Sequence, residues 1–459
     1  MVGYVHAGAG APLLGTLTGE VDSVIVVGAG AAGVTVANAL TGAKVPTVVL
    51  EARDRVGGRI HTVDLGSAPV DLGASWIHNP RDNPLSDLAR SLGISQVPFE
   101  AFDEACGWDP ASGDRVPSAE FRDLYATAEQ VLAQALEGPD VRLQTGIEKA
   151  AAELDLPERS RARVLALARV FTEADSSGWL EELTVPGFPA NTLEFDGSPM
   201  GDVPVGGYRE LVGALAAGLD VQLGCAVTWI EVGADGVRVG CEDGSELAAS
   251  HAVVTVPLGV LKGRSIDFRP ALDSSRSHAI DRLGFGRFDK LVMRYDHSYW
   301  QDIDVSHLVC TPSDGSPAPQ GLLSQDGILG QPIIMAFAFG STHAWLADSE
   351  LEEVTAAAHD LLCRALGKEL PPPVESLRSE WWRDPWTRGA YTYLKEGATY
   401  DDLETLGRPH AGRVLFAGEA TGAARTGFVD GAILTAVREV KRLTGRDSAL
   451  LERLPISNV

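Results

Sequence analysis

Short runs of apolar residues alternate with glycine-rich and polar segments near the start of the chain. Residues 24–27 form the first run, and residues 47–50 form the second. Continuous apolar runs of this length are typical of strands that are buried on both faces of a parallel sheet. Between them lies a segment rich in small residues that extends to about Leu40, which predicts a helix. The pattern therefore predicts a β-α-β unit.

The middle of the chain changes to a helical period. Between residues 118 and 180, apolar positions recur at the spacing of one helix face, so this region is predicted to be mainly helical. The positions expected to face a core are Leu124, Ala128, Val131, Ala135, Val164, Leu167 and Val170.

Later segments of the chain return to short β-type runs. These runs are separated from one another by turn residues. Such runs predict strands. A closing helix is predicted from about Gly431. The predicted strands cover residues 227–232, 236–241, 252–256, 290–295, 333–339 and 413–416.

The charge balance narrows the classes of partner. The 459 residues include 38 basic and 63 acidic ones, a net charge of -25. Such a surface repels phosphate backbones, which argues against nucleic acid as a partner. It would also attract protonated amines, although an acidic surface more often serves solubility alone.

The cysteines and the N-terminal residues bear on the compartment. The chain has five scattered cysteines without a C-x-x-C pair, which predicts neither a disulfide framework nor a metal site and favours a reducing, cytoplasmic environment. Residues 1–18 lack the basic start of a signal peptide, so residues 1–20 are expected to be a mobile leader. Residues 23–40 are apolar, but their spaced glycines favour a soluble strand–turn–helix over a membrane span. The cysteines are Cys106, Cys225, Cys241, Cys310 and Cys363.

A dinucleotide fingerprint lies between the first strand and the first helix. Gly28, Gly30 and Gly33 have the spacing that allows a tight turn, close approach of a pyrophosphate and close helix–strand packing. The N-terminus of the following helix offers unpaired N–H groups to phosphate. Glu51 ends the second strand, where an acidic residue binds ribose hydroxyl groups. This unit predicts a dinucleotide site and leaves FAD and NAD both open.

Further motifs carry a resemblance to a known family. Residues 51–59, EARDRVGGR, resemble the run of flavoproteins with two dinucleotide-binding domains, which implies FAD. Residues 71–78, DLGASWIH, are similar to the flavin-side segment of polyamine oxidases. Matching runs follow in order at residues 255–262, 284–290, 381–391 and 416–421. Together they resemble the flavin amine oxidases, especially polyamine oxidases and the lysine-specific histone demethylase, over residues 24–442.

The resemblance implies roles for individual residues. Lys290 would reach flavin N5 through a water, and Trp381 would pack against the flavin ring. Tyr391 and Phe428 match the two rings of the aromatic cage, which orients an amine by cation–π contact and shape. Glu173 matches a helix carboxylate that holds a distal ammonium in some polyamine oxidases, and His78 resembles a histidine near the amine group. Asp196 and Glu194 lie in a second acidic stretch of the substrate domain, and Asp196 is a further candidate for substrate binding. Each of these acidic residues is otherwise a solvated surface charge, and a single His is often structural.

The resemblance also implies a set of cofactor contacts, in which Arg59 would neutralise the pyrophosphate and Glu419 would lie near the ribitol. The full set is Gly28, Gly30, Ala31, Ala32, Gly33, Glu51, Ala52, Arg53, Gly58, Arg59, Gly73, Ala74, Ser75, Trp76, Val227, Trp381, Gly418, Glu419 and Val429.

Departures from the family pattern refine these expectations. Ala390 stands where covalently flavinylated relatives have Cys, so FAD is expected to bind non-covalently. Asp430 replaces a His common in polyamine oxidases, which weakens any exact substrate equivalence. Residues 73–76 replace the run whose Arg binds a carboxylate in amino-acid oxidases, which disfavours amino acids. The helical tower of the demethylase is absent, so chromatin is not an expected partner.

The resulting prediction is an α/β fold with a Rossmann-like FAD-binding domain and an interleaved substrate domain of mixed sheet plus helices. The expected activity is hydride transfer from the carbon beside a neutral amine to flavin N5, with O2 as acceptor, giving an aldehyde, an amine or ammonia and H2O2. The alternative is a flavin oxidase or dehydrogenase of a specialised secondary amine or amino acid. Metal sites and membrane association are not expected, and monomer and homodimer both stay open. The FAD-binding segments are residues 21–82, 204–286 and 407–459, and the substrate-domain segments are residues 83–203 (helical) and 287–406 (sheet).

Overall fold

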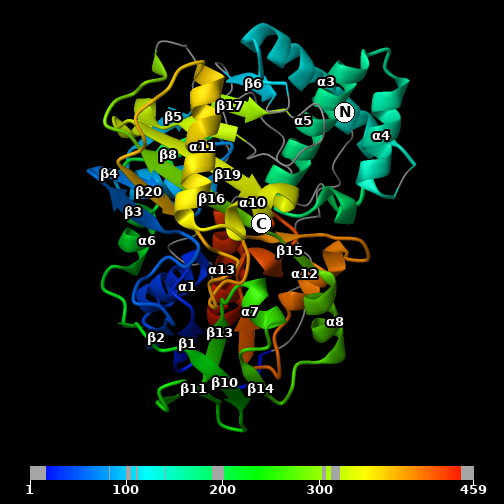
Figure 1. The fold of residues 1–459 in the computed structure, drawn as a ribbon. Helices are drawn as coiled ribbons and strands as arrows, with labels where there is room; N and C mark the ends of the chain where they lie inside the picture. Colours follow the sequence, from blue (N-terminus) through cyan, green and yellow to red (C-terminus); the bar gives the residue numbers. More distant parts are fainter. Residues whose placement is uncertain are drawn as a thin grey trace.

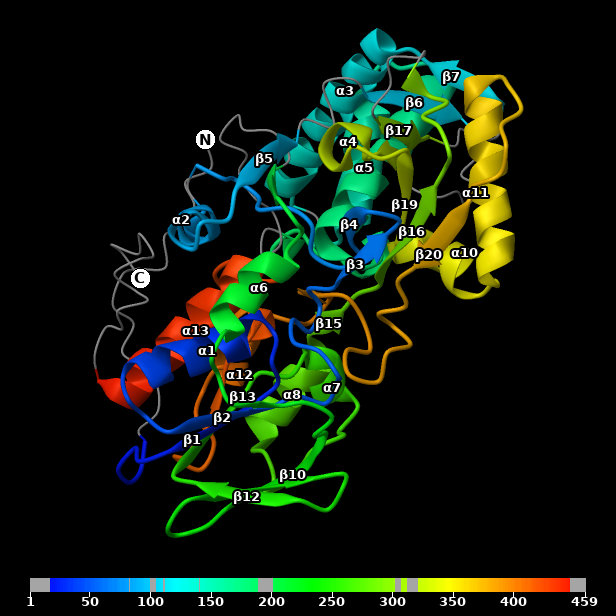
Figure 2. The same ribbon diagram turned by 90° about the vertical axis from the view of Figure 1, so that its left-hand side faces the viewer.

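The computed structural model describes residues 17–81, 83–99, 105–109, 112–139, 141–188, 201–301, 307–311 and 321–445. These residues form two lobes, which Figures 1 and 2 show one above the other. The lower lobe is built on a five-stranded sheet and the upper lobe on a seven-stranded sheet. The architecture is therefore mixed α/β.

The five-stranded sheet of the lower lobe is parallel throughout, in the order β22-β13-β1-β2-β9. Its strands come from three separate parts of the chain, as the interleaved prediction requires. Helices α1 (Ala31–Gly42), α6 (Arg209–Ala216) and α13 (Val429–Thr444) pack on one face. A four-stranded sheet contributes to the core on the other face. Its strands, in order, are β12 (Glu246–Ala249), β11 (Val237–Cys241), β10 (Val227–Val232) and β14 (Asp267–Arg269). The strands of the five-stranded sheet are β1 (Val24–Val27), β2 (Thr47–Leu50), β9 (Val221–Gln222), β13 (His251–Val254) and β22 (Val414–Phe416).

The seven-stranded sheet of the upper lobe has the order β20-β16-β19-β18-β17-β6-β7. Helix α11 (Leu351–Leu366) covers one face, and the hairpin of β3 (Thr62–Leu65) and β4 (Ala68–Asp71) packs against the other. Helices α3 (Ser118–Glu137), α4 (Leu143–Glu153) and α5 (Glu158–Ser176) form a helical layer with its own core. The strands are β6 (Ala105–Asp109), β7 (Asp114–Val116), β16 (Phe288–Arg294), β17 (His307–Cys310), β18 (Gly321–Ser324), β19 (Ile333–Phe339) and β20 (Glu375–Arg378).

Most predicted elements are confirmed. Strands β1, β2 and β19 have the predicted bounds, as does β10 (Val227–Val232), and the helical region contains α3, α4 and α5. The closing helix α13 begins at Val429, two residues before the predicted start. Asp430 therefore lies in the first turn of this helix, where its side chain is buried and pairs with Arg425.

Core packing divides the chain differently from the predicted boundaries. Helix α2 (Pro84–Ser91), predicted in the substrate domain, contributes Leu85 and Leu88 to the core of the lower lobe. Helix α12 (Tyr400–Leu406) does the same through Leu403 and Leu406. The hairpin of β3 (Thr62–Leu65) and β4 (Ala68–Asp71), predicted in the FAD-binding domain, packs on the seven-stranded sheet. These short segments cross between the lobes, and apolar periodicity does not show which core receives them.

The expectation that no disulfide forms is wrong. Cys225 and Cys241 are joined, with their Cα atoms 5.7 Å apart. Antiparallel pairing of β10 with β11 (Val237–Cys241) sets Val227 opposite Cys241 and so brings Cys225 near. Register creates this pair, and the spacing of the cysteines along the sequence does not reveal it. The disulfide also weakens the argument from cysteine usage for a reducing compartment. Cys106, Cys310 and Cys363 are buried free thiols.

In the part of the chain that the structure describes, no helix combines the length and the apolar character that a membrane span requires. No cluster of His, Cys, Asp and Glu side chains in the same residues has an arrangement able to hold a metal ion.

Candidate active site

The glycine fingerprint forms the turn between β1 and α1. Gly28 has a φ of +102°, and a Cβ on Gly33 would lie 1.9 Å from the Gly28 carbonyl oxygen. Gly30 is the N-cap of α1 and has no side chain that could cap the helix. The N–H groups of the first turn, those of Ala31, Ala32 and Gly33, therefore receive no side-chain cap. A pyrophosphate fits this arrangement, because it needs close backbone approach and free donors.

Glu51 connects the fingerprint to the second strand. Its carboxylate is buried and accepts hydrogen bonds from the N–H of Ala29 (2.7 Å) and from the N–H of Arg53 (2.9 Å), the residue after Ala52. The Glu51 carbonyl accepts from the N–H of Cys225 (2.9 Å), two residues before Val227. The predicted ribose-binding residue and Val227 therefore lie at the same end of the parallel sheet. The Arg53 guanidinium forms an ion pair with Asp384 (2.6 Å).

The second glycine pair brings Arg59 to the centre of the molecule. Gly57 and Gly58 both have positive φ, and Gly57 N–H donates to the Ala29 carbonyl (2.8 Å), so this loop lies on the fingerprint. Arg59 donates to the Ala390 carbonyl (2.7 Å) and to the Glu419 carboxylate (2.9 Å).

Glu419 joins three segments of the chain. It accepts from Arg59, from the N–H and hydroxyl of Thr392 (3.3 and 3.1 Å) and from the N–H of Gly427 (3.0 Å). Gly418 before it has a φ of +135°. Phe428 then caps α13 without a side-chain hydrogen bond, so the first turn from Val429 is a second helix N-terminus with no side-chain cap. The predicted cofactor contacts therefore assemble from both ends of the chain around one region.

Lys290 is buried in β16 beneath the segment of residues 71–76. Its ammonium donates to the carbonyl oxygens of Asp71 (3.1 Å) and Gly73 (2.7 Å) and to the Ser75 hydroxyl. It also lies 5.0 Å from the centre of a Trp76 ring. Burial lowers the pKa of Lys290 to about 8. Ala74 N–H donates to the Arg59 carbonyl (3.3 Å), which ties this segment to the Gly57–Arg59 loop.

Trp381 and Lys290 share one buried support. Asp289 accepts from the N–H of Trp381 (2.9 Å) and from the Ser379 hydroxyl (2.7 Å), whose oxygen accepts the N–H of Lys290 (2.9 Å). The other Asp289 oxygen pairs with His343 Nε2 (2.7 Å). The Trp381 indole N–H donates to the Leu72 carbonyl (3.0 Å), on the segment that Lys290 holds. Sequence reasoning missed Asp289, although an Asp inside an apolar strand run was a usable signal.

Asp289→Asn is expected to lower the free energy of unfolding by about 2 kcal/mol. The amide N–H of Asn would face Nε2 of His343, so the imidazole proton must move from Nε2 to Nδ1. Nδ1 is buried without a hydrogen-bond partner among the described residues, so the proton on it would have no acceptor. Thermal melting of the purified protein measures the loss. Asp296→Asn is the control, because Asp296 is exposed and should leave the melting temperature unchanged. Equal melting temperatures for all three proteins would contradict the assigned network.

The aromatic residues form one connected wall. Starting at Tyr391, consecutive ring centroids are 6.2, 5.9, 6.0, 6.3 and 5.6 Å apart, and the series ends at Phe428. The Tyr391 hydroxyl donates to the Ala174 carbonyl at the end of α5. The two predicted cage rings are thus joined through intermediate rings, one of which belongs to His78. The series is Tyr391, Phe288, Phe337, Trp76, His78 and Phe428.

The acidic residues that were predicted to bind the substrate amine do not present a free carboxylate in the described part of the chain. Glu173 is fully buried, and its oxygens accept from Arg169 (2.9 Å) and from the N–H (2.9 Å) and hydroxyl (2.7 Å) of Ser341. The role of Glu173 in amine binding stays a prediction. Glu194 and Asp196 lie outside the described residues.

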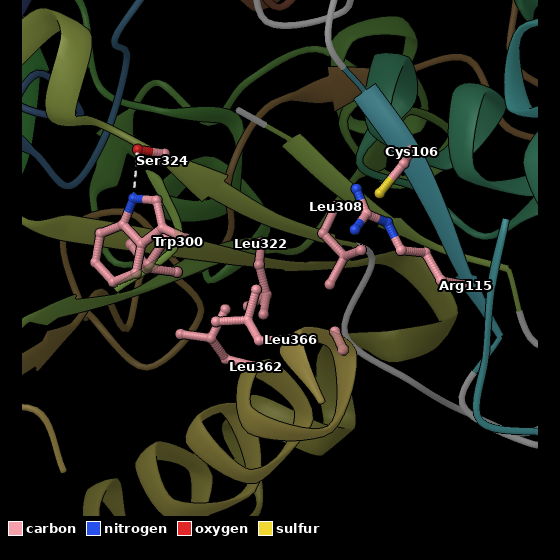
Figure 3. Close-up of a pocket in the computed structure, with 10 residues that line it drawn as sticks. Cys106, Arg115, Trp300, Leu308, Leu322, Ser324, Leu362 and Leu366 are labelled. Atoms are coloured by element: carbon pink, nitrogen blue, oxygen red, sulfur yellow. Dashed lines mark hydrogen bonds between the residues drawn. The ribbon is translucent and has the colours of Figure 1, made fainter. Parts of the chain in front are cut away.

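A separate pocket lies under α11 in the upper lobe. Figure 3 shows it between the seven-stranded sheet and the helix, with Trp300, Leu308 and Leu362 on its walls and Cys106 beside Arg115. None of the predicted site residues lines this pocket. It is therefore distinct from the site that Lys290, Trp381 and Arg59 define.

The fold and the site define a flavin-dependent oxidoreductase. The chain belongs to the family of flavin containing amine oxidoreductases, whose profile matches residues 31–444. The protein is therefore an FAD-binding enzyme of the amine oxidase class.

Individual relatives agree with this assignment. Over 432 residues the chain is 31% identical to polyamine oxidase 2 of Arabidopsis thaliana, covering 90% of this chain and 86% of that protein. It is 33% identical over 449 residues to lysine-specific histone demethylase 1 homolog 2 of Oryza sativa subsp. japonica. That match covers 92% of this chain but only 57% of the demethylase homologue. The fold matches a structure of putrescine oxidase bound to putrescine with a TM-score of 0.74 and 21% identity, over 93% of this chain and 99% of that one.

Proposed function

We propose that this protein oxidises a diamine or polyamine with O2, giving an aldehyde, a shorter amine or ammonia and H2O2. The observation that carries the proposal is the meeting of two features at one place. The aromatic wall from Tyr391 to Phe428 passes through Trp76, and the Lys290 ammonium lies 5.0 Å from a ring of Trp76. A surface suited to an amine therefore adjoins the buried cation that the family places beside the flavin.

The residues of the chain have separable tasks in this reaction. When bound, FAD supplies the acceptor for the hydride that leaves the carbon beside the amine nitrogen. Gly30, Arg59 and Glu419 would hold it through the uncapped helix N-terminus and the central ion pair. Non-covalent binding agrees with Ala390, which has no thiol to form a bond.

The rings favour the reactive form of the substrate. An amine loses hydride only as the neutral base, and the apolar faces of Tyr391 and Phe428 exclude the water that stabilises its ammonium form. Lys290 keeps a proton on Nζ below about pH 8, because burial lowers its pKa to about 8. A cation at this position would stabilise negative charge that develops as O2 is reduced.

Anaerobic mixing tests the function. The purified holoenzyme is combined with spermine, spermidine, putrescine or n-pentylamine, and the oxidised flavin band is followed. Bleaching by a polyamine or diamine, followed by H2O2 release on admission of air, is the expected result. A flavin band that none of these amines bleaches would refute the proposal.

One observation favours a second candidate, an oxidase of a secondary amine or amino acid that carries a carboxylate. Arg425 pairs with Asp430 at the position where polyamine oxidases commonly have His. Its guanidinium carbon lies 5.1 Å from the centre of the Phe428 ring, and the side chain is 24% exposed. A cation beside the cage would attract a substrate carboxylate. Bleaching by amino acids, lost in Arg425→Gln, would establish this candidate.

A further inference from the structure

Lys290 and Trp381 lie just beyond a regular strand pairing. Strands β16 and β20 pair antiparallel, and their last paired residues at this end are Leu291 and Arg378. The N–H of Ser379 still donates to the Lys290 carbonyl (2.9 Å), whereas the N–H of Lys290 donates to the Ser379 hydroxyl (2.9 Å). From this point the backbone ladder gives way to hydrogen bonds made by side chains.

Asp289 is the residue on which these side-chain bonds converge. Its Oδ1 accepts both the Ser379 hydroxyl (2.7 Å) and the N–H of Trp381 (2.9 Å). Its Oδ2 pairs with Nε2 of His343 (2.7 Å), the first residue of α10 (His343–Ala347), which lies beside β16 in Figures 1 and 2. Asp289 and His343 are only 2% and 1% exposed, and hydrogen bonds to a carboxylate are strong in such an interior. The carboxylate therefore fixes the Trp381 backbone against β16.

The tips of the two side chains meet a third segment, which borders the cofactor region. The Trp381 indole N–H donates to the Leu72 carbonyl (3.0 Å), and the Lys290 ammonium donates to the Gly73 carbonyl (2.7 Å). A Cβ on Gly73 would lie 1.8 Å from the Arg59 carbonyl oxygen and 3.1 Å from the Trp381 ring. Lys290 and Trp381 are thus fixed at the backbone by the buried carboxylate and at the tip by this segment, next to the loop that lies on the glycine fingerprint.

A buried polar support is an expensive way to gain stability alone. Burial removes a carboxylate and an imidazole from water, and an apolar pair of similar size would hold the same sheet together without that loss. Directional hydrogen bonds, in contrast, define one arrangement of the groups that they join. We propose that Asp289, held by His343, is a positioning residue for the flavin reactions of this enzyme, because it fixes Lys290 and Trp381 relative to each other. This role rests on the FAD and O2 chemistry of the proposed function and does not depend on which amine is oxidised.

Asp289→Ala tests the role, because it removes the hydrogen bonds to Ser379, Trp381 and His343. The holoenzyme is reduced anaerobically by light in the presence of EDTA, without any amine, and is then mixed with O2. Recovery of the oxidised flavin band should be at least about tenfold slower than in the wild type, because small displacements of supporting groups have effects of this size. The fluorescence of the oxidised flavin should rise, because an indole against the flavin ring quenches it by electron transfer and Trp381 would no longer be held in place.

Asp109→Ala is the matched control. Asp109 is likewise a buried carboxylate of the seven-stranded sheet, on β6, and it pairs with Arg159 (3.4 Å) and Arg163 (3.5 Å). Its loss should lower the melting temperature and leave flavin reoxidation and fluorescence unchanged. If Asp109→Ala changes both readouts as Asp289→Ala does, lost stability is the cause and the positioning role is overturned. Wild-type readouts in a folded Asp289→Ala protein overturn it as well.

Ser379 provides the test if Asp289→Ala does not fold. Ser379→Ala removes only the hydroxyl between Asp289 and Lys290, and Ser379→Thr keeps a hydroxyl at that place. Slower reoxidation in Ser379→Ala that returns to the wild-type rate in Ser379→Thr supports the positioning role. Wild-type rates in both variants, or equal losses in both, overturn it. If O2 does not reoxidise even the wild-type flavin, that part of the proposed function fails, and the flavin fluorescence of the same variants then judges Asp289 alone.

Discussion

Lys290→Met is expected to slow reoxidation of the reduced flavin by O2 about a hundredfold. The substitution keeps the length of the side chain and removes the ammonium that contacts Asp71, Gly73 and Ser75. Anaerobically reduced enzyme is mixed with O2, and recovery of the oxidised flavin band gives the rate. FAD content should stay close to that of the wild type, because Lys290 is not among the expected cofactor contacts.

The pH dependence sharpens this result. Burial lowers the pKa of Lys290 to about 8, so its ammonium form is present below that pH and is lost above it. The wild-type reoxidation rate should therefore fall as the pH rises through about 8, and the rate of Lys290→Met should not change there. A variant that reoxidises as fast as the wild type would exclude a role for the cation.

Lys262 provides the matched control. Burial also lowers the pKa of Lys262 to about 8, and its ammonium also donates to backbone carbonyls, those of Ile280 (2.6 Å) and Asp281 (3.2 Å). It lies on α7 (Leu258–Lys262), which packs in the core of the lower lobe. Lys262→Met should lower stability without changing the reoxidation rate or its pH dependence. If both variants slow reoxidation equally, loss of a buried lysine is the cause and not the position of Lys290.

Gly33→Ala is expected to abolish FAD binding and to destabilise the fold by about 3 kcal/mol. The new Cβ would lie 1.9 Å from the Gly28 carbonyl oxygen and 3.0 Å from the Thr255 hydroxyl. Because the first of these atoms is backbone, the turn itself must move. The ratio of flavin to protein absorbance after purification measures the binding, and thermal melting measures the stability.

Gly42→Ala is the control on the same helix. A Cβ on Gly42 meets nothing within 4 Å, so the substitution should keep the flavin and leave stability unchanged or raised by up to about 1 kcal/mol. Equal flavin content in Gly33→Ala and Gly42→Ala would contradict the assignment of the fingerprint turn.

The parts that sequence predicted best are local. The glycine fingerprint, Glu51 and the strand–helix–strand unit around them lie within a short stretch, and steric rules for glycine act between near neighbours. The predicted strands β1, β2 and β19 have the expected bounds, because a continuous apolar run is favoured in a strand whose two faces are both buried. Motif order also indicated that the parallel sheet draws on three parts of the chain.

Contacts between segments that are distant along the chain could not be predicted from the sequence. Asp289 supports both Lys290 and Trp381, although only one of these two is its neighbour along the chain. The Cys225–Cys241 disulfide depends on strand register, and scattered cysteines were read as free. The short helix α12 packs in the lower lobe, although its position along the chain suggested the upper one.

The acidic residues of α5 show most directly which features the sequence determines and which features only the tertiary structure determines. By itself, the sequence determined that this is an α/β flavoprotein of the amine oxidase type and that carboxylates lie near the end of a helix. Glu173 and Asp175 are two residues apart, and helical periodicity places them on different sides without telling which one faces a partner. Only the tertiary structure decided that Glu173 is buried and bound by Ser341, because Ser341 arrives through packing of the helix end against the segment after β19.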